Sequence, residues 1–201
     1  MPYYIRVLST SPITASLQKI KTQLQKQRLD AKLSSAGEQD NWDRLLVTHP
    51  DDLEICEIER NPVENDGLGQ EEIQEFLEEI ENCRPPTAVD WLKNYLKDVK
   101  TIYAMQILFE GADHGNGWEI IGVVKEAIHG DVSGIIQADH EGFTNEDGYH
   151  ILWQFSENVD GLWWMAVLKD GKWKNFQMDL GNHVHREHFW RGEMPPDAKI
   201  K

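Results

Sequence analysis

The sequence contains few cysteines and no long apolar run, and both absences exclude whole classes of protein. Its longest apolar stretch, Leu162–Leu168, is far shorter than the roughly 20 residues of a membrane-spanning helix. Cys56 and Cys83 stand apart, with no C-x-x-C pair and no spacing typical of a disulfide framework. The first residues lack the charged-then-apolar pattern of a signal peptide. We therefore expect a soluble, cytoplasmic protein with reduced thiols and no membrane partner.

The sequence also lacks the short motifs that identify common catalytic and phosphate-binding sites. It has no G-x-S-x-G elbow, no H-E-x-x-H pair and no histidine beside either cysteine. The stretch Gly111–Gly117 could cradle an anion between a strand and a helix. However, Ile120 stands where G-x-G-x-x-G needs its third glycine, and there is no P-loop lysine. This stretch is therefore interpreted as a connector, and no cofactor is predicted.

The net charge of −15 is concentrated in the middle of the chain. Residues 1–36 carry six basic and one acidic side chain, residues 37–90 carry three and 17, and residues 91–201 carry 11 and 17. A surface this negative repels phosphate backbones, so we expect no nucleic-acid partner. The acidic segment is either a solvated surface or a docking face for a basic protein.

Hydrophobic periodicity predicts an α+β protein with mainly antiparallel sheets. Helices are expected at 12–28, 70–83, 87–98 and 118–129. Strands are expected at 3–8, 29–33, 42–48, 53–59, 100–109, 134–143, 149–156 and 162–168, with one more after 169–172. The first helix is predicted to start at Ser11-Pro12, since serine is a favourable N-cap and proline a favourable first residue.

Two small β-α-β-β-β-type halves follow from this order of elements. The N-terminal half spans 1–68, a helical connector spans 69–99, and a tryptophan-rich C-terminal half spans 100–201 and ends in an irregular, histidine-containing tail. Residue identity between the halves is poor. The repeated order therefore indicates either a duplication of topology or two unrelated α+β pieces.

The segment 134–179 holds the densest run of predicted strands. Asp170-Gly171 between two alternating segments is a strong hairpin signal. A longer turn, Thr144–Gly148, should pair 134–143 with 149–156. Since 162–168 is apolar on both alternating faces, we expect it to be a central strand covered on both sides.

Acids and histidines of this region offer candidates for catalysis or metal binding. Asp139 and Glu141, on one face of the predicted strand, could act as general acid and base. The candidate metal ligands are the histidines His140, His150, His183, His185 and His188. In the predicted hairpin, His140 and His150 would be diagonal neighbours about 7–8 Å apart. These residues define the alternative function, a hydrolase with or without a divalent metal.

The preferred interpretation of the function rests on the eight tryptophans of the sequence. Those in the predicted second sheet, with a neighbouring tyrosine, are the candidate binding residues: Trp153, Trp163, Trp164, Trp173 and Tyr149. Large rings commonly pack in a core, but an exposed subset would line a cleft or anchor a partner. We expect a non-catalytic binding or protein-interaction protein whose partner is a protein or a small polar ligand. A homo-oligomer is also compatible with this pattern.

Overall fold

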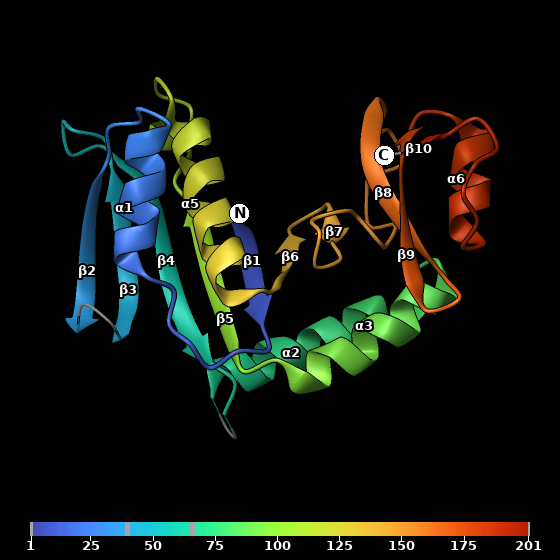
Figure 1. Cartoon of the computed structure of the whole chain (residues 1–201), viewed down its shortest axis with the longest axis horizontal. Helices are drawn as coiled ribbons and strands as arrows, with labels where there is room; N and C mark the ends of the chain where they lie inside the picture. The colour runs from blue at the N-terminus through green and yellow to red at the C-terminus, as the bar shows by residue number, and fades with distance from the viewer. Residues whose placement is uncertain (1, 39–40, 65–66, 201) are drawn as a thin grey trace. The chain divides into compact units, whose positions relative to one another are not determined.

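The computed structural model describes residues 2–38, 41–64 and 67–200. Within these ranges the chain forms six α-helices and ten strands, and the paired strands are mainly antiparallel (Figure 1). The predicted α+β class is confirmed. In the same ranges, no helix is both long and apolar enough to cross a membrane.

The chain divides into two compact units, and each is assembled from two separate segments. Unit 1 comprises Met1–Gln70 and Val99–Gly134, and unit 2 comprises Glu71–Asp98 and Ile135–Lys201. This division differs from the predicted boundaries at 68, 99 and 100, because a strand after residue 100 belongs to the N-terminal sheet. The predicted duplication of topology stays a prediction.

Unit 1 contains a five-stranded antiparallel sheet in the order β2-β3-β4-β5-β1. Its strands are β1 (Tyr3–Ser9), β2 (Lys32–Glu38), β3 (Asn41–Thr48), β4 (Glu54–Pro62) and β5 (Thr101–Ile107). β5 lies between β4 and β1, where Met105 is opposite both Ile58 and Ile5. The N-terminal strands therefore need residues 101–107 to complete their sheet.

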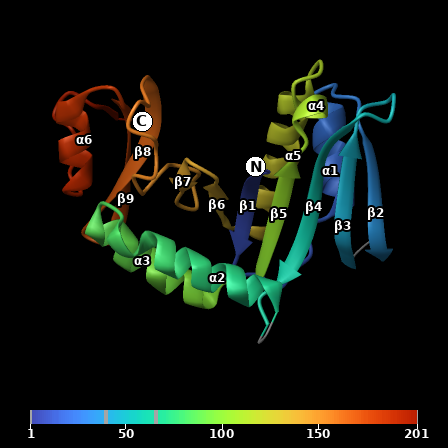
Figure 2. The same ribbon diagram turned by 180° about the vertical axis from the view of Figure 1, so that it is seen from behind.

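Helices cover one face of this sheet, as Figures 1 and 2 show from opposite sides. They are α1 (Leu17–Lys26), the short α4 (Phe109–Ala112) and α5 (Gly117–Val132). The predicted start of the first helix at Ser11-Pro12 is wrong: Ser16 is the N-cap, and its hydroxyl accepts the Lys19 N–H. The buried Tyr103 hydroxyl bonds to the main chain of Ile13 and Ala15. These bonds hold the residues before Ser16 outside the helix.

Unit 2 combines a helical arm, a short hairpin and a small sheet with one helix. Its elements are α2 (Leu68–Glu79, which begins at the end of unit 1), a 3-10 turn (Ile80–Asn82), α3 (Pro86–Asp98), β6 (Ile135–Ala138), β7 (Gly142–Phe143), β8 (Leu162–Lys169), β9 (Lys172–Asp179), α6 (His183–Trp190) and β10 (Lys199–Ile200). The sheet has the order β10-β9-β8. One face of it packs in a core cluster with Phe155, Leu180 and Phe189.

The predicted hairpin of 134–143 with 149–156 forms only next to its turn, where Thr144 bridges His150 and the Ile151 N–H donates to Phe143 O. β6 turns back at once and pairs with β7, with Gln137 opposite Phe143. The Glu141 N–H donates to the Ala138 carbonyl, and His140 has a positive φ of 66°. Asp139, His140 and Glu141 therefore lie in a tight turn and not along a strand, and 149–156 makes only isolated bridges.

The strand predicted at 162–168 forms, but it is not the central strand of its sheet. β9 is central, and β8 lies at the edge, covered by a bridge to His150. The His150 N–H donates to Trp164 O, and the Ala166 N–H donates to His150 O. The hairpin at Asp170-Gly171 is confirmed, since both residues have positive φ. The tail is partly helical: α6 forms where an irregular segment was expected, because Asn182 caps it.

Candidate functional site

A groove in unit 2, with a volume of about 1080 Å³, is the largest of the described hollows. It lies where β8, β9 and β10 meet the segment that follows α6, and Figure 1 shows α6 beside these strands. We call it the β9 groove. Its lining consists of Val167, Lys169, Trp173, Lys174, Asn175, His188, Gly192, Glu193, Met194, Pro196 and Ile200.

The alternation of β8 and β9 places lysines in this groove. Val167 is opposite Lys174, and Lys169 is opposite Lys172, so these pairs share the sheet face of Met165. That face is apolar near its middle, where it belongs to the core cluster. It becomes basic toward the turn of the hairpin. The groove is therefore locally positive in a chain whose net charge is −15.

The outer edge of β9 is open along half of its length. β10 pairs only with Phe176 and Gln177. Within the described part of the chain, no strand pairs with Lys172–Asn175 on that side. Since Trp173, Lys174 and Asn175 all line the groove, it follows this open edge. An edge of this kind presents main-chain N–H and C=O groups to a further strand.

His188, a predicted metal ligand, lies in the groove wall. Its Nδ1 is 3.2 Å from Glu193 Oε2, and the same carboxylate oxygen is 3.3 Å from Arg191 Nε. Glu193 is thus shared between His188 and Arg191. The His188 and Glu193 side chains form a polar wall of the groove.

The other two histidines of α6 have different carboxylate partners. His183 lies 3.6 Å from Glu187, on the exposed surface. His185 is buried, accepts the Asp179 N–H at Nδ1, and lies 3.0 Å from Asp197 at Nε2. The three histidines of α6 thus lie beside three different carboxylates. Among the residues that the structure describes, no group of three or more His, Cys, Asp or Glu side chains could hold a metal ion.

The remaining candidates for hydrolysis lie outside the groove. Asp139, His140 and Glu141 occupy the β6–β7 turn. The His150 ring packs against Phe155 and Trp163, with centroids 5.3 and 5.2 Å away. The catalytic assignment of Asp139 and Glu141 stays a prediction, and so does the metal-assisted alternative.

Of the predicted aromatic residues, only Trp173 lines the groove. Its ring meets Trp91 edge-on at 5.0 Å, and Trp91 stacks on Tyr95. The other predicted aromatics pack in pairs and clusters elsewhere: Trp153 and Trp163 against Phe155, and Trp164 against Tyr149. The tryptophan-rich clusters of unit 2 are thus present, but most of the rings serve packing.

Sequence reasoning missed most of the groove, above all Lys169 and Lys174. One signal could have pointed to them: Lys169, Lys172 and Lys174 cluster around one turn of an acidic chain. No local sequence pattern predicts that Glu193, Met194 and Ile200 line the groove, because the segment after α6 sets their positions.

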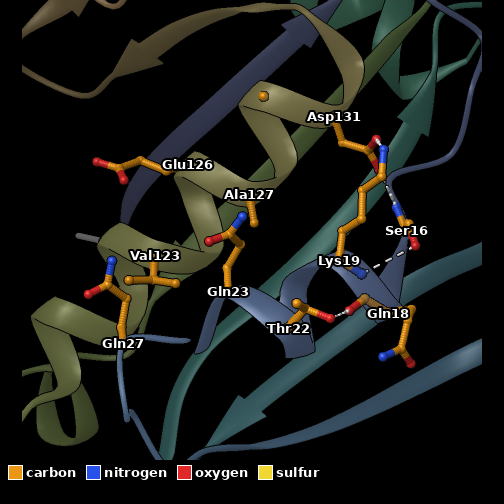
Figure 3. Close-up of a pocket in the computed structure, with 11 residues that line it drawn as sticks. Ser16, Gln18, Lys19, Thr22, Gln23, Gln27, Val123, Glu126, Ala127 and Asp131 are labelled. Carbon is orange, nitrogen blue, oxygen red and sulfur yellow. Dashed lines mark hydrogen bonds and ion pairs between the residues drawn. The ribbon is translucent and has the colours of Figure 1, made fainter. Parts of the chain in front are cut away.

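A second hollow of about 500 Å³ lies between α1 and α5 of unit 1 (Figure 3). Its wall consists of polar and small side chains, and its one buried charged group is Asp131. That carboxylate accepts the Ser16 N–H at 2.7 Å and pairs with Lys19. Burial raises the pKa of Asp131, but these donors lower it further, so the net pKa lies below the ordinary 3.8. The carboxylate already has partners within unit 1 and serves to join the two helices.

Comparison of the chain with protein-family models, with curated proteins and with solved structures gave no significant match. The groove must therefore be interpreted from its own residues. These residues make it basic, partly aromatic and open along a strand edge.

Proposed function

We propose that the protein is a non-catalytic binding protein, and that the β9 groove takes an extended, acidic segment of a partner protein. The observation that carries this proposal is the open edge of β9 at Lys172–Asn175, which lies inside a lysine-bearing groove. The expectation of cytoplasmic location, which rests on the two isolated cysteines, belongs to the same proposal.

The edge favours a peptide in strand conformation. A peptide that pairs with Lys172–Asn175 would continue the line of β10, which occupies the same side of β9 at Phe176 and Gln177. Main-chain hydrogen bonds supply affinity in this mode of recognition, and side-chain pockets supply specificity.

The charges of the groove favour acidic side chains in the peptide. Lys169 and Lys174 have no carboxylate partner among the described residues, whereas the groove's acid, Glu193, pairs with Arg191. Opposite charges steer association and discriminate among partners more than they add to affinity. An acidic segment would therefore be selected, and a basic one rejected.

Apolar side chains of the same groove provide anchors. Met194 and Ile200 are exposed, and Trp173 forms part of the same lining. A peptide that alternates acidic and apolar residues would place one set over the lysines and the other against these side chains. In a strand added to β9, successive side chains would point to opposite faces of the sheet, so acidic and apolar residues would be separated in this way.

The test uses the full chain and a synthetic peptide with acetylated and amidated ends, Glu-Val-Glu-Val-Glu-Val-Glu. We expect its titration to shift the amide signals of Lys172–Asn175 and to slow their hydrogen exchange. A peptide with Pro in place of the central valine loses its main-chain donor there and should bind at least about tenfold more weakly.

Charge reversal provides the matched controls. The double variant Lys169→Glu, Lys174→Glu should lower the affinity at least about tenfold, and rising salt should weaken binding by the wild type. The same reversal at Lys21 and Lys26 of α1 should leave binding unchanged. Equal binding of a Lys-Val peptide, or no effect of the groove variant, would contradict the proposal.

A further inference from the structure

Unit 1 carries large aromatic side chains that remain exposed although they lie together. Phe109 of α4 is 48% exposed and Trp118 of α5 is 44% exposed, and their ring centroids are 6.3 Å apart. The ring centroid of Tyr3 of β1 lies 6.4 Å from that of Phe109. We call these three residues the aromatic patch. Exposed aromatic groups of this kind commonly mark interaction sites.

Close packing fixes the backbone beneath the patch. A Cβ atom added at Gly111 would lie 2.0 Å from the carbonyl oxygen of Glu54, so only glycine lets α4 sit against β4. His49 Nε2 lies 2.9 Å from the Gly111 carbonyl oxygen. Figure 2 shows α4 beside the start of α5. The Trp118 indole N–H donates to Asp113 Oδ1 at 2.8 Å, which fixes the ring. The patch is therefore preorganised, and binding would cost little ordering.

An acidic hollow of about 500 Å³ adjoins Phe109. It is lined by Asp52, Leu53, Glu54, Leu108, Phe109 and Glu110. Asp52 pairs with Lys32 at 2.7 Å. No ion pair to Glu54 or Glu110 occurs among the residues that the structure describes. Two carboxylates thus remain available beside an exposed aromatic ring.

We propose that the aromatic patch and the acidic hollow together bind an arginine-bearing segment of a partner protein. A guanidinium group stacks on aromatic faces and also pairs with carboxylates, and this surface offers both. Phe109 and Trp118 supply the rings, and Glu54 and Glu110 supply the charge. Negative charge around the rings disfavours a phosphate-bearing ligand. This surface lies in the other unit from the β9 groove and has the opposite charge, so the two proposals stand or fall separately.

The probe is the peptide Gly-Arg-Gly-Arg-Gly-Arg-Gly with acetylated and amidated ends, added to the full chain at low salt. The readout is the indole N–H signal of Trp118, which the variant Trp118→Phe identifies among the eight tryptophans. We expect a saturable shift that salt weakens. The Lys analogue should bind at least about threefold more weakly, because lysine stacks less well on the rings. The Glu analogue should not bind.

Two variants locate the site. Phe109→Ala and the double variant Glu54→Gln, Glu110→Gln should each weaken the Arg peptide about tenfold. The matched controls are Ile13→Ala, another exposed apolar residue of unit 1, and Glu126→Gln on α5. Circular dichroism checks that each variant is folded. Equal loss in the controls, or an unshifted Trp118 signal, would overturn the proposal. So would a dimer in sedimentation velocity that Phe109→Ala abolishes, because a second copy would then cover the patch.

Discussion

Buried polar and thiol groups of this chain serve structure at the level of single residues. The Asp131 side chain is 7% exposed and accepts hydrogen bonds from Ser16 and Lys19. Cys56 is buried, and burial raises the pKa of its thiol to about 12, so it is not a nucleophile at neutral pH.

Replacement of Asp131 by Asn should destabilise the protein by about 1–2 kcal/mol at pH 7, because a charge-assisted bond to Lys19 is lost. The pKa of Asp131 in the folded chain is below the ordinary 3.8. The carboxylate therefore stabilises the fold above about pH 4, and this contribution declines as the pH falls through the folded pKa. Urea unfolding of both proteins between pH 7 and pH 3 should show the difference shrinking toward acid.

The matched control is Asp52→Asn, since the Asp52 side chain is 80% exposed and pairs with Lys32. An exposed pair contributes little, so this variant should change stability by less than about 0.5 kcal/mol. A loss at Asp131 that is independent of pH would contradict the assignment.

At the scale of elements, turns and caps decide where strands and helices stop. The β8–β9 hairpin depends on Asp170 and Gly171, whose φ angles are 52° and 72°. The β6–β7 hairpin depends on His140, which also has positive φ. The first turn was predicted from its Asp-Gly pair. The second was missed because residues 134–143 were interpreted as one continuous strand, although histidine is among the residues enriched at positive φ.

Gly171→Ala should destabilise unit 2 by about 1 kcal/mol, since a Cβ atom is strained at positive φ. Asp170→Asn is the control, and it should be neutral because Asn tolerates the left-handed region. Thermal unfolding followed by near-UV circular dichroism, which reports the tryptophan clusters, measures both. Equal effects of the two changes would mean that the turn conformation is not what holds the hairpin.

At the scale of the whole molecule, each unit is built from two separate parts of the chain. β5 supplies a buried strand with Ile102, Tyr103, Met105 and Ile107, and it pairs with both β4 and β1. The N-terminal strands alone thus lack the element between them. The sequence suggested instead that residues 1–68 form a half of their own.

A fragment of residues 1–98 should consequently be unfolded, because β1 and β4 lose their shared neighbour β5. Circular dichroism and proton NMR of the fragment should show no cooperative transition and little dispersion, with the full chain as the folded control. A cooperative transition in the fragment would support the predicted N-terminal half in place of the observed division.

Local patterns in the chain predict the α+β class, most helices and strands, and the Asp-Gly hairpin, because periodicity and turn chemistry act over a few residues. The prediction of a tryptophan-rich C-terminal half also agrees with the aromatic clusters of unit 2. Three features become visible only in the folded chain: β5 completes the N-terminal sheet, β9 and not β8 is central, and Lys169, Lys174 and Ile200 share a groove. The physical reason is that strand order and groove walls depend on pairings between distant residues. Those pairings are selected by the packing of the whole chain.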